Sequence, residues 1–183
     1  MYERVINFWF KETKSEDWFK KNDTFDNKIR DRFGSLYEDA INKKLDERHK
    51  SSVSCLALIL ILDQFSRNLF RDRALAFDQD PRALELSQLA INKNYLDCYS
   101  DDEKLFALLP LIHSENIKIH FLAKKLREKF LSGHPRYGTI EKSWDDHRLV
   151  IEKFGRYPHR CKLKGLELTE DEKLYLSQTD SSW

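Results

Sequence analysis

The stretch LDQFSRNLFR contains the polar residues whose spacing best suits chemistry. If the apolar helix before it continues, Asp63 and Arg67 lie one turn apart and form an ion pair that fixes the guanidinium group. Arg71 follows one turn later, and Gln64 and Asn68 form the adjacent row. Such groups recognise planar carboxylates and amides, so we expect this strip to bind a small anionic group. An exposed amphipathic face with ordinary ion pairs is the alternative.

A second candidate is the sequence His113-Ser114-Glu115, which lies where one predicted helix ends and the next begins. The free N–H groups of a helix N-terminus favour an anion, and a histidine beside them can exchange a proton. The alternative is simple capping, in which Ser114 is the N-cap and Glu115 favours the helix dipole.

The third candidate is HRLVIEKFGRYPHR, which carries His147, Arg156, His159 and Arg160. His147 lies on the apolar face of its helix, where a histidine is more often a core residue than a catalyst. The other three residues lie on a rigid turn and suit a carboxylate or phosphate partner. Interaction of these cations with the nearby helix C-terminus is the alternative.

The elements that must position these residues are helices, because apolar residues recur at steps of three and four and no stretch alternates convincingly. Thr24, Ser51 and Asp80 are expected helix N-caps. Gly155 suits the left-handed position that ends a helix, and Pro158 should keep that helix from resuming. Glycine (5) and proline (4) are scarce, which favours long helices. We predict an all-α fold of about seven or eight helices in antiparallel succession, a tetratricopeptide-like helical array.

The length of 183 residues fits a single helical domain, 1–183, and the net charge of +1 gives no overall attraction to nucleic acid or membrane. The charge is uneven, since residues 118–164 hold 13 Lys and Arg against 5 Asp and Glu. Residues 167–183 form an acidic extension with one Lys against 5 acids. We expect this extension to pack on the same domain, with a solvated charged face as the alternative.

Several function classes find no support in the sequence. Cys55, Cys98 and Cys161 are widely spaced, so neither a disulfide framework nor a zinc site is expected, and the histidine spacing predicts no metal. No phosphate-binding loop or dinucleotide motif is present, and we expect no cofactor and no nucleic-acid partner. The N-terminal residues lack the apolar core of a signal peptide, and the longest apolar run, Cys55–Leu62, is too short to span a membrane. A cytoplasmic location is expected.

The three motifs, with FWF near the start and AFDQD before residue 81, resemble the bacterial family known as domain of unknown function 924. The resemblance covers nearly the whole chain and implies an all-helical, tetratricopeptide-like fold, but no activity. Two positions depart from the family pattern, since Ile112 replaces a usual glutamate and Cys161 a usual asparagine. The polar motif positions of the family match Asp63, Gln64, Arg67, Asn68, Arg71, His113, Ser114, Glu115, His147, Arg156, His159 and Arg160.

Three hypotheses follow for these residues. The first is a pocket for a small anionic molecule, lined by all three motifs, in which His113, His147 or His159 exchanges protons with Glu115 or Asp63. The second is an interaction module that binds an acidic or C-terminal peptide in a helical groove. The third is purely structural, with buried ion pairs that tie helix ends together. Only the first requires the motifs to meet in one pocket.

Overall fold

The structure is a computed structural model that describes residues 1–45 and 51–178. Throughout these ranges the regular structure is helical and there is no strand, so the predicted all-α class is confirmed. The elements η1 and η3 are π-helical and η4 and η5 are 3-10 helices. In chain order the elements are α1 (Tyr2–Asn7), η1 (Phe8–Glu12), α2 (Asp23–Ile41), α3 (Ser52–Ile59), η3 (Leu60–Phe65), α4 (Ser66–Leu69), η4 (Ala74–Phe77), α5 (Asp80–Asn92), η5 (Tyr95–Cys98), α6 (Asp101–Ile112), α7 (Ile117–Phe130), α8 (Tyr137–Phe154), α9 (Pro158–Leu163) and α10 (Glu170–Gln178).

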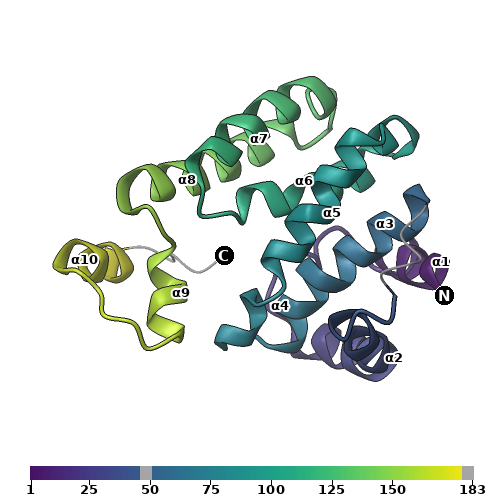
Figure 1. Ribbon diagram of the computed structural model, residues 1–183, viewed down its shortest axis with the longest axis horizontal. Helices are drawn as coiled ribbons and strands as arrows, with labels where there is room; N and C mark the ends of the chain where they lie inside the picture. Colours follow the sequence, from purple (N-terminus) through teal and green to yellow (C-terminus); the bar gives the residue numbers. More distant parts are fainter. Residues whose placement is uncertain (46–50, 179–183) are drawn as a thin grey trace.

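One central helix is formed by α3, η3 and α4 in unbroken succession (Figure 1). It begins at a capping box in which Ser51 and Ser54 satisfy each other's backbone N–H groups. Its apolar side chains point in all directions, and it is surrounded by α1, α2, α5 and α6. The stretch Ser52–Leu69 is long and apolar enough to cross a membrane, yet 78% of it is buried inside the fold. It therefore packs as the central helix of the hydrophobic core.

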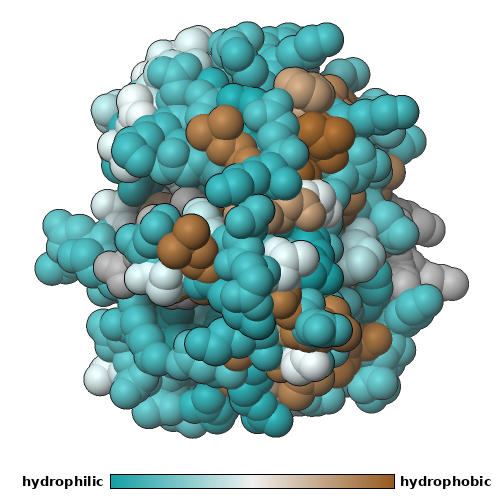
Figure 2. All heavy atoms as spheres, turned by 90° about the vertical axis from the view of Figure 1, so that its left-hand side faces the viewer, coloured by the Kyte–Doolittle hydropathy of each residue, from teal (hydrophilic) through white to brown (hydrophobic). Residues whose placement is uncertain are grey.

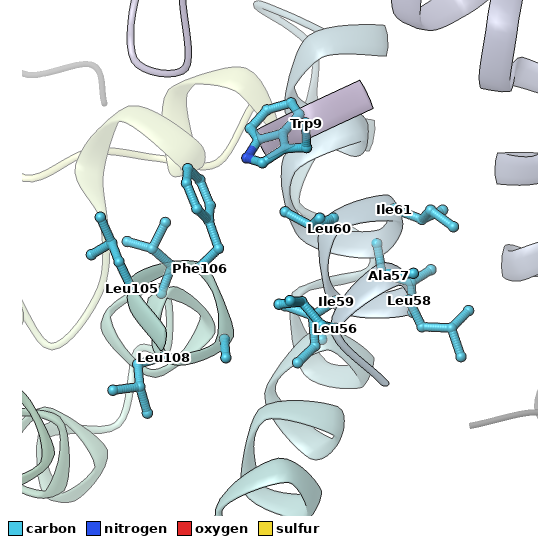
Figure 3. Packing of buried hydrophobic residues seen from close by; sticks show 14 of the residues in the cluster. Trp9, Leu56, Ala57, Leu58, Ile59, Leu60, Ile61, Leu105, Phe106 and Leu108 are labelled. Carbon is cyan, nitrogen blue, oxygen red and sulfur yellow. The ribbon is translucent and has the colours of Figure 1, made fainter. Parts of the chain in front are cut away.

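The hydrophobic core forms where α6 and the N-terminal segment meet the central helix. Figure 3 shows Trp9 above Leu60 and Phe106 to their left, with the ring of Phe106 directed toward the indole. Their ring centroids lie 5.4 Å apart and the rings are perpendicular, a favourable edge-to-face geometry. All three side chains are buried. The core therefore fixes one side of the central helix and leaves its polar C-terminal end to other contacts.

The later helices follow one another through the fold, since α5, α6, α7 and α8 each pack against the next. The segments α9 and α10 lie at the left of Figure 1, and α9 contacts both α10 and η4. A separate small cluster of Val150, Ile151 and Tyr157 supports this end. Figure 2 views the molecule from this side and shows a mainly hydrophilic surface with scattered hydrophobic patches.

Several helix ends differ from the sequence expectation by a few residues. Asn22, not Thr24, caps α2, because its side-chain oxygen accepts the Phe25 N–H at 3.1 Å. Asp80 is the first residue of α5 and not its cap, which leaves its carboxylate for other partners. Gly155 does adopt the left-handed conformation at the end of α8, with φ of 69°. Pro158 begins α9 there, since proline fits the first helical turn.

We predict that Leu60→Ala lowers the free energy of unfolding by about 2–5 kcal/mol, because it removes a fully buried side chain and leaves a cavity. Leu75→Ala is the matched control, since Leu75 is 41% exposed, and it should change stability by less than about 0.5 kcal/mol. Urea denaturation of the three proteins measures both values. Equal losses for the two variants would contradict the assignment of this core.

Candidate functional site

A small pocket lies between the polar end of the central helix and the C-terminal helices. Its lining includes two guanidinium groups, three imidazole rings and two aromatic rings. In this structure it has room for about one water molecule. The pocket therefore has room for a single oxygen atom of a ligand's terminal group. The lining residues are Arg67, Phe77, His113, His147, Tyr157, His159 and Arg160.

A buried carboxylate orients one of these histidines. Asp63 lies in the π-helical segment η3, a kind of segment that often occurs at functional sites. Its Oδ1 atom is 2.7 Å from Nδ1 of His113, and its Oδ2 accepts the Gln64 amide at 2.5 Å. The contact with an ionised carboxylate places the proton of a neutral His113 on Nδ1 and leaves the lone pair of Nε2 available. No described residue makes a hydrogen bond to Nε2.

The two arginines of the pocket share one carboxylate. Arg67 binds Asp80 through both terminal nitrogens, at 3.0 and 3.2 Å, and also contacts Asp63 at 3.1 Å. Arg160 reaches the same Asp80 at 3.2 Å and donates to the His113 carbonyl oxygen at 2.9 Å. Asp80 thereby connects α4, α5 and α9, and the guanidinium groups are held in fixed positions.

Aromatic rings form the outer wall of the pocket. The Arg160 guanidinium lies 4.3 Å from the ring centroid of Tyr157 and 4.8 Å from that of Phe77. The Tyr157 hydroxyl donates to the Ile112 carbonyl oxygen, which holds α9 against the end of α6. His159 packs against both rings, at 5.6 and 5.7 Å. The Nε atom of Arg160 is buried and has no hydrogen-bond partner among the described residues.

Burial and neighbouring charges keep the histidines neutral and Asp63 ionised. Burial alone would raise the pKa of Asp63, but Arg67 and His113 outweigh it and hold that pKa below its usual value. Burial and Arg67 lower the pKa of His113 in spite of Asp63. Burial lowers the pKa of His147 and of His159 to about 3 each, with nearby positive groups adding to the effect. The pocket therefore presents neutral imidazoles at neutral pH.

Six of the residues singled out in the sequence meet at this pocket. Asp63 lies behind the lining, and the other five belong to it. His147 contributes its ring from α8, 6.2 Å from His113, while its Nδ1 lies 2.7 Å from the Ser143 carbonyl oxygen. The role of these six residues in binding or catalysis stays a prediction. The six are Asp63, Arg67, His113, His147, His159 and Arg160.

Two residues of the first motif bind elsewhere. The central helix ends at Leu69, so Arg71 is not one further turn along the same strip. Asn68 donates to Asp26 of α2 at 2.7 Å, and Arg71 binds both carboxylate oxygens of Asp26. These contacts tie the end of the central helix to α2, which is a structural role.

The remaining motif residues hold the surrounding segments in place. Glu115 accepts the Tyr157 N–H at 2.9 Å and so holds the residue that precedes α9. Ser114 accepts the Asn116 N–H, and Asn116, not Ser114, caps α7. Arg156 binds both oxygens of Glu172 in α10, at 2.6 and 2.7 Å, and does not line the pocket. Residues 179–183 of the acidic extension lie outside the described residues.

Sequence reasoning missed Asp80, Phe77 and Tyr157 as members of the site. Asp80 was assigned a capping role because it precedes a proline, although the repeated acids in AFDQD could have suggested a partner for the arginines. Tyr157 lies within the third motif, HRLVIEKFGRYPHR, and Phe77 lies within AFDQD. Arg67 and Asp80 pair across thirteen residues, and residue spacing along one helix does not predict a pair that is this far apart.

The arrangement can bind an anion and move a proton. Two guanidinium groups offer donors, and His113, oriented by Asp63, offers an acceptor at Nε2. No group of three or more His, Cys, Asp or Glu side chains that could bind a metal occurs in the described part of the chain.

Comparison with known proteins identifies the family of the chain. The family model for "Bacterial protein of unknown function (DUF924)" matches residues 5–180. The chain belongs to this family. A solved structure of a protein of unknown function from Agrobacterium tumefaciens is similar over 97% of both chains, with 34% sequence identity and a TM-score of 0.88. No curated protein matches the chain. The family and the related structure carry no assigned activity, so function must be argued from the pocket.

We predict that Asp80→Ala lowers the free energy of unfolding by about 3–5 kcal/mol, because it leaves two largely buried guanidinium groups without their shared carboxylate. Asp78→Ala is the matched control, since Asp78 is exposed and lies two residues away. It should change stability by less than about 0.5 kcal/mol. Chemical denaturation measures both effects, and a small loss for Asp80→Ala would show that the bridge is dispensable.

A pH dependence of stability follows from His147. Its folded pKa of about 3 lies below the value of about 6.5 in an unfolded chain. Between these values the unfolded chain binds a proton that the folded chain does not, so stability falls as pH falls from about 6.5 to 3. His147→Gln should reduce this slope by up to about 1.4 kcal/mol per pH unit. Urea denaturation at several pH values tests it, and parallel curves for the two proteins would contradict it.

Proposed function

We propose that the pocket binds a small molecule through an anionic group such as a carboxylate, and that His113 exchanges a proton with the bound molecule. One observation carries this proposal. Residues from all three motifs line the same pocket, and a buried carboxylate orients His113, which lies beside Arg67 and Arg160. An oriented histidine beside fixed positive groups is the arrangement that general acid–base catalysis uses.

The burial of the cations supports a pocket over a peptide groove. A groove for an acidic or C-terminal peptide needs exposed arginine and asparagine side chains along its length. Arg160 is 7% exposed and Asn68 is 5% exposed, and both are bound to internal carboxylates or carbonyl groups. The small pocket instead suits the end of a small molecule, whose remaining atoms extend toward solvent past Phe77 and His159, the half-buried members of the aromatic wall.

The structural hypothesis accounts for other motif residues. Asn68, Arg71 and Arg156 hold helices together and take no part in the proposed binding. We also propose a cytoplasmic location, which the three free cysteines fit because thiols persist in a reducing compartment.

We predict that acetate and formate bind to this pocket and that Arg160→Lys weakens their binding about tenfold, since lysine lacks the fixed fork of donors. Arg156→Lys is the matched control, because Arg156 belongs to the same motif but binds Glu172 outside the pocket. It should leave the dissociation constants unchanged. Chemical-shift titration of the labelled protein with each anion gives both the constant and the residues affected.

Two outcomes would contradict the proposed function. The first is the absence of anion-dependent shifts at the lining residues at millimolar concentration. The second is an equal effect of the two arginine substitutions, which would indicate general electrostatics. Thermal melting of each variant shows whether the protein is folded, so a loss of binding is not confused with unfolding.

A further inference from the structure

The fixed charges around the pocket cancel. Arg67 and Arg160 are positive, while Asp63 and Asp80 are negative, and three ion pairs connect them in the order Asp63, Arg67, Asp80, Arg160. Glu115, which is exposed, adds a negative charge near Tyr157. The pocket that should attract an anion therefore has no net positive charge of its own. A bound anion would bring an uncompensated negative charge into a largely buried site, which is costly.

The arginines line the pocket and can donate hydrogen bonds to an anion, but their charges are already paired with Asp63 and Asp80. Asp63 is fully buried and Asp80 is 9% exposed, and neither lines the pocket. The guanidinium groups stand between these carboxylates and the pocket. An anion in the pocket can accept hydrogen bonds from the guanidinium groups that line it. It still needs one further positive charge for balance.

A neutral histidine is the group that can supply this charge, and His113 is the best placed of the three. Its Nδ1 atom faces a fully buried carboxylate at 2.7 Å, which stabilises a protonated ring. The corresponding atom of His147 faces the Ser143 carbonyl oxygen, a weaker partner for a cation. His159 contacts aromatic rings.

The groups around His113 come from every element packed on it. Asp63 and Asp80 favour its protonated form, and the positive charges of Arg67 and Arg160 oppose it. In the absence of an anion, burial of the ring and the charge of Arg67 outweigh the two carboxylates and lower the pKa of His113. A negative ligand beside the arginines offsets their effect and shifts the balance toward the protonated ring. The titratable groups that face this cluster are Asp63, Arg67, Asp80, His120, His147, Tyr157, His159 and Arg160.

We propose that the pocket takes up one proton, on His113, with each anion that it binds. This inference rests on the proposed function, because it requires that the pocket bind an anion. The proton comes from solvent and forms a bond with Nε2, while the Nδ1 proton stays in the hydrogen bond with Asp63. The charge of the complex then equals that of the empty pocket. The ligand class is a monoanion, because one proton compensates one negative charge.

Linkage gives the proposal a quantitative form. If one proton accompanies each anion, the dissociation constant rises about tenfold for each unit of increasing pH over about pH 6–8. The probe is methanesulfonate, a monoanion whose own charge is constant over this range. Its binding is followed by chemical-shift titration at several pH values, and the imidazole resonances of labelled histidine report the protonation of His113 directly.

Two variants separate His113 from the other histidines. In His113→Gln, methanesulfonate binding should no longer depend on pH, and its affinity should equal the weak affinity of the wild-type protein at high pH. His134→Gln is the matched control, because His134 also contacts a carboxylate, Asp102 at 3.1 Å, but lies outside the pocket. It should keep the full pH dependence. Histidine resonances of the wild-type protein answer the question even if a variant fails to fold.

The outcomes distinguish this inference from the proposed function. Binding that strengthens toward low pH, with protonation of His113 on saturation, supports both. Binding at the pocket that is independent of pH, with His113 still neutral, overturns the proton uptake and leaves the anion pocket intact. Protonation of His147 or His159 in place of His113 also overturns the inference. The absence of binding at every pH overturns the proposed function itself.

Discussion

The carboxylate of Asp80 is the contact on which the polar half of this fold depends. It binds two guanidinium groups that come from helices nearly a hundred residues apart, and it does so where water has little access. A buried charge needs a partner, and a buried guanidinium without one would be strongly destabilising. The central helix, α5 and α9 are therefore held in one arrangement by a requirement for charge balance. The pocket is the space that this arrangement leaves beside the two arginines.

The central helix shows how one element serves both core and site. Its first part is apolar in every direction and packs into the hydrophobic core around Trp9 and Phe106. Its last part is equally buried but polar, so each side chain there must find a partner. Asp63 contacts His113 and Arg67, whereas Asn68 donates a hydrogen bond to Asp26 of α2. The change from apolar to polar coincides with the π-helical segment, where the side-chain positions shift relative to a regular helix.

The sequence predicted the helical class and much of the local geometry, because helix periodicity, capping residues and Gly155 act over a few residues. The position of Asp63 and Arg67 one turn apart was local in the same sense. The binding of Asp80 by two arginines is not a local feature, since it depends on how α5 and α9 approach the central helix. The same reason explains Arg71 and Arg156, which have the residue types of a binding site but bind Asp26 and Glu172 instead. Residue type indicates what a side chain can bind, and tertiary packing decides which partner it meets.

The wall of the pocket that α9 provides has a consequence for folding. Asp63 and Asp80 are made early in synthesis, whereas Tyr157 and Arg160 follow near the end of the chain. Until α9 docks, Asp80 lacks one of its two cations and the Ile112 carbonyl oxygen lacks the Tyr157 hydroxyl. Contacts of such high sequence separation carry a larger loop-closure cost than local contacts do. The pocket is thus complete only when α9 is docked, although the larger hydrophobic cluster contains no residue of α9.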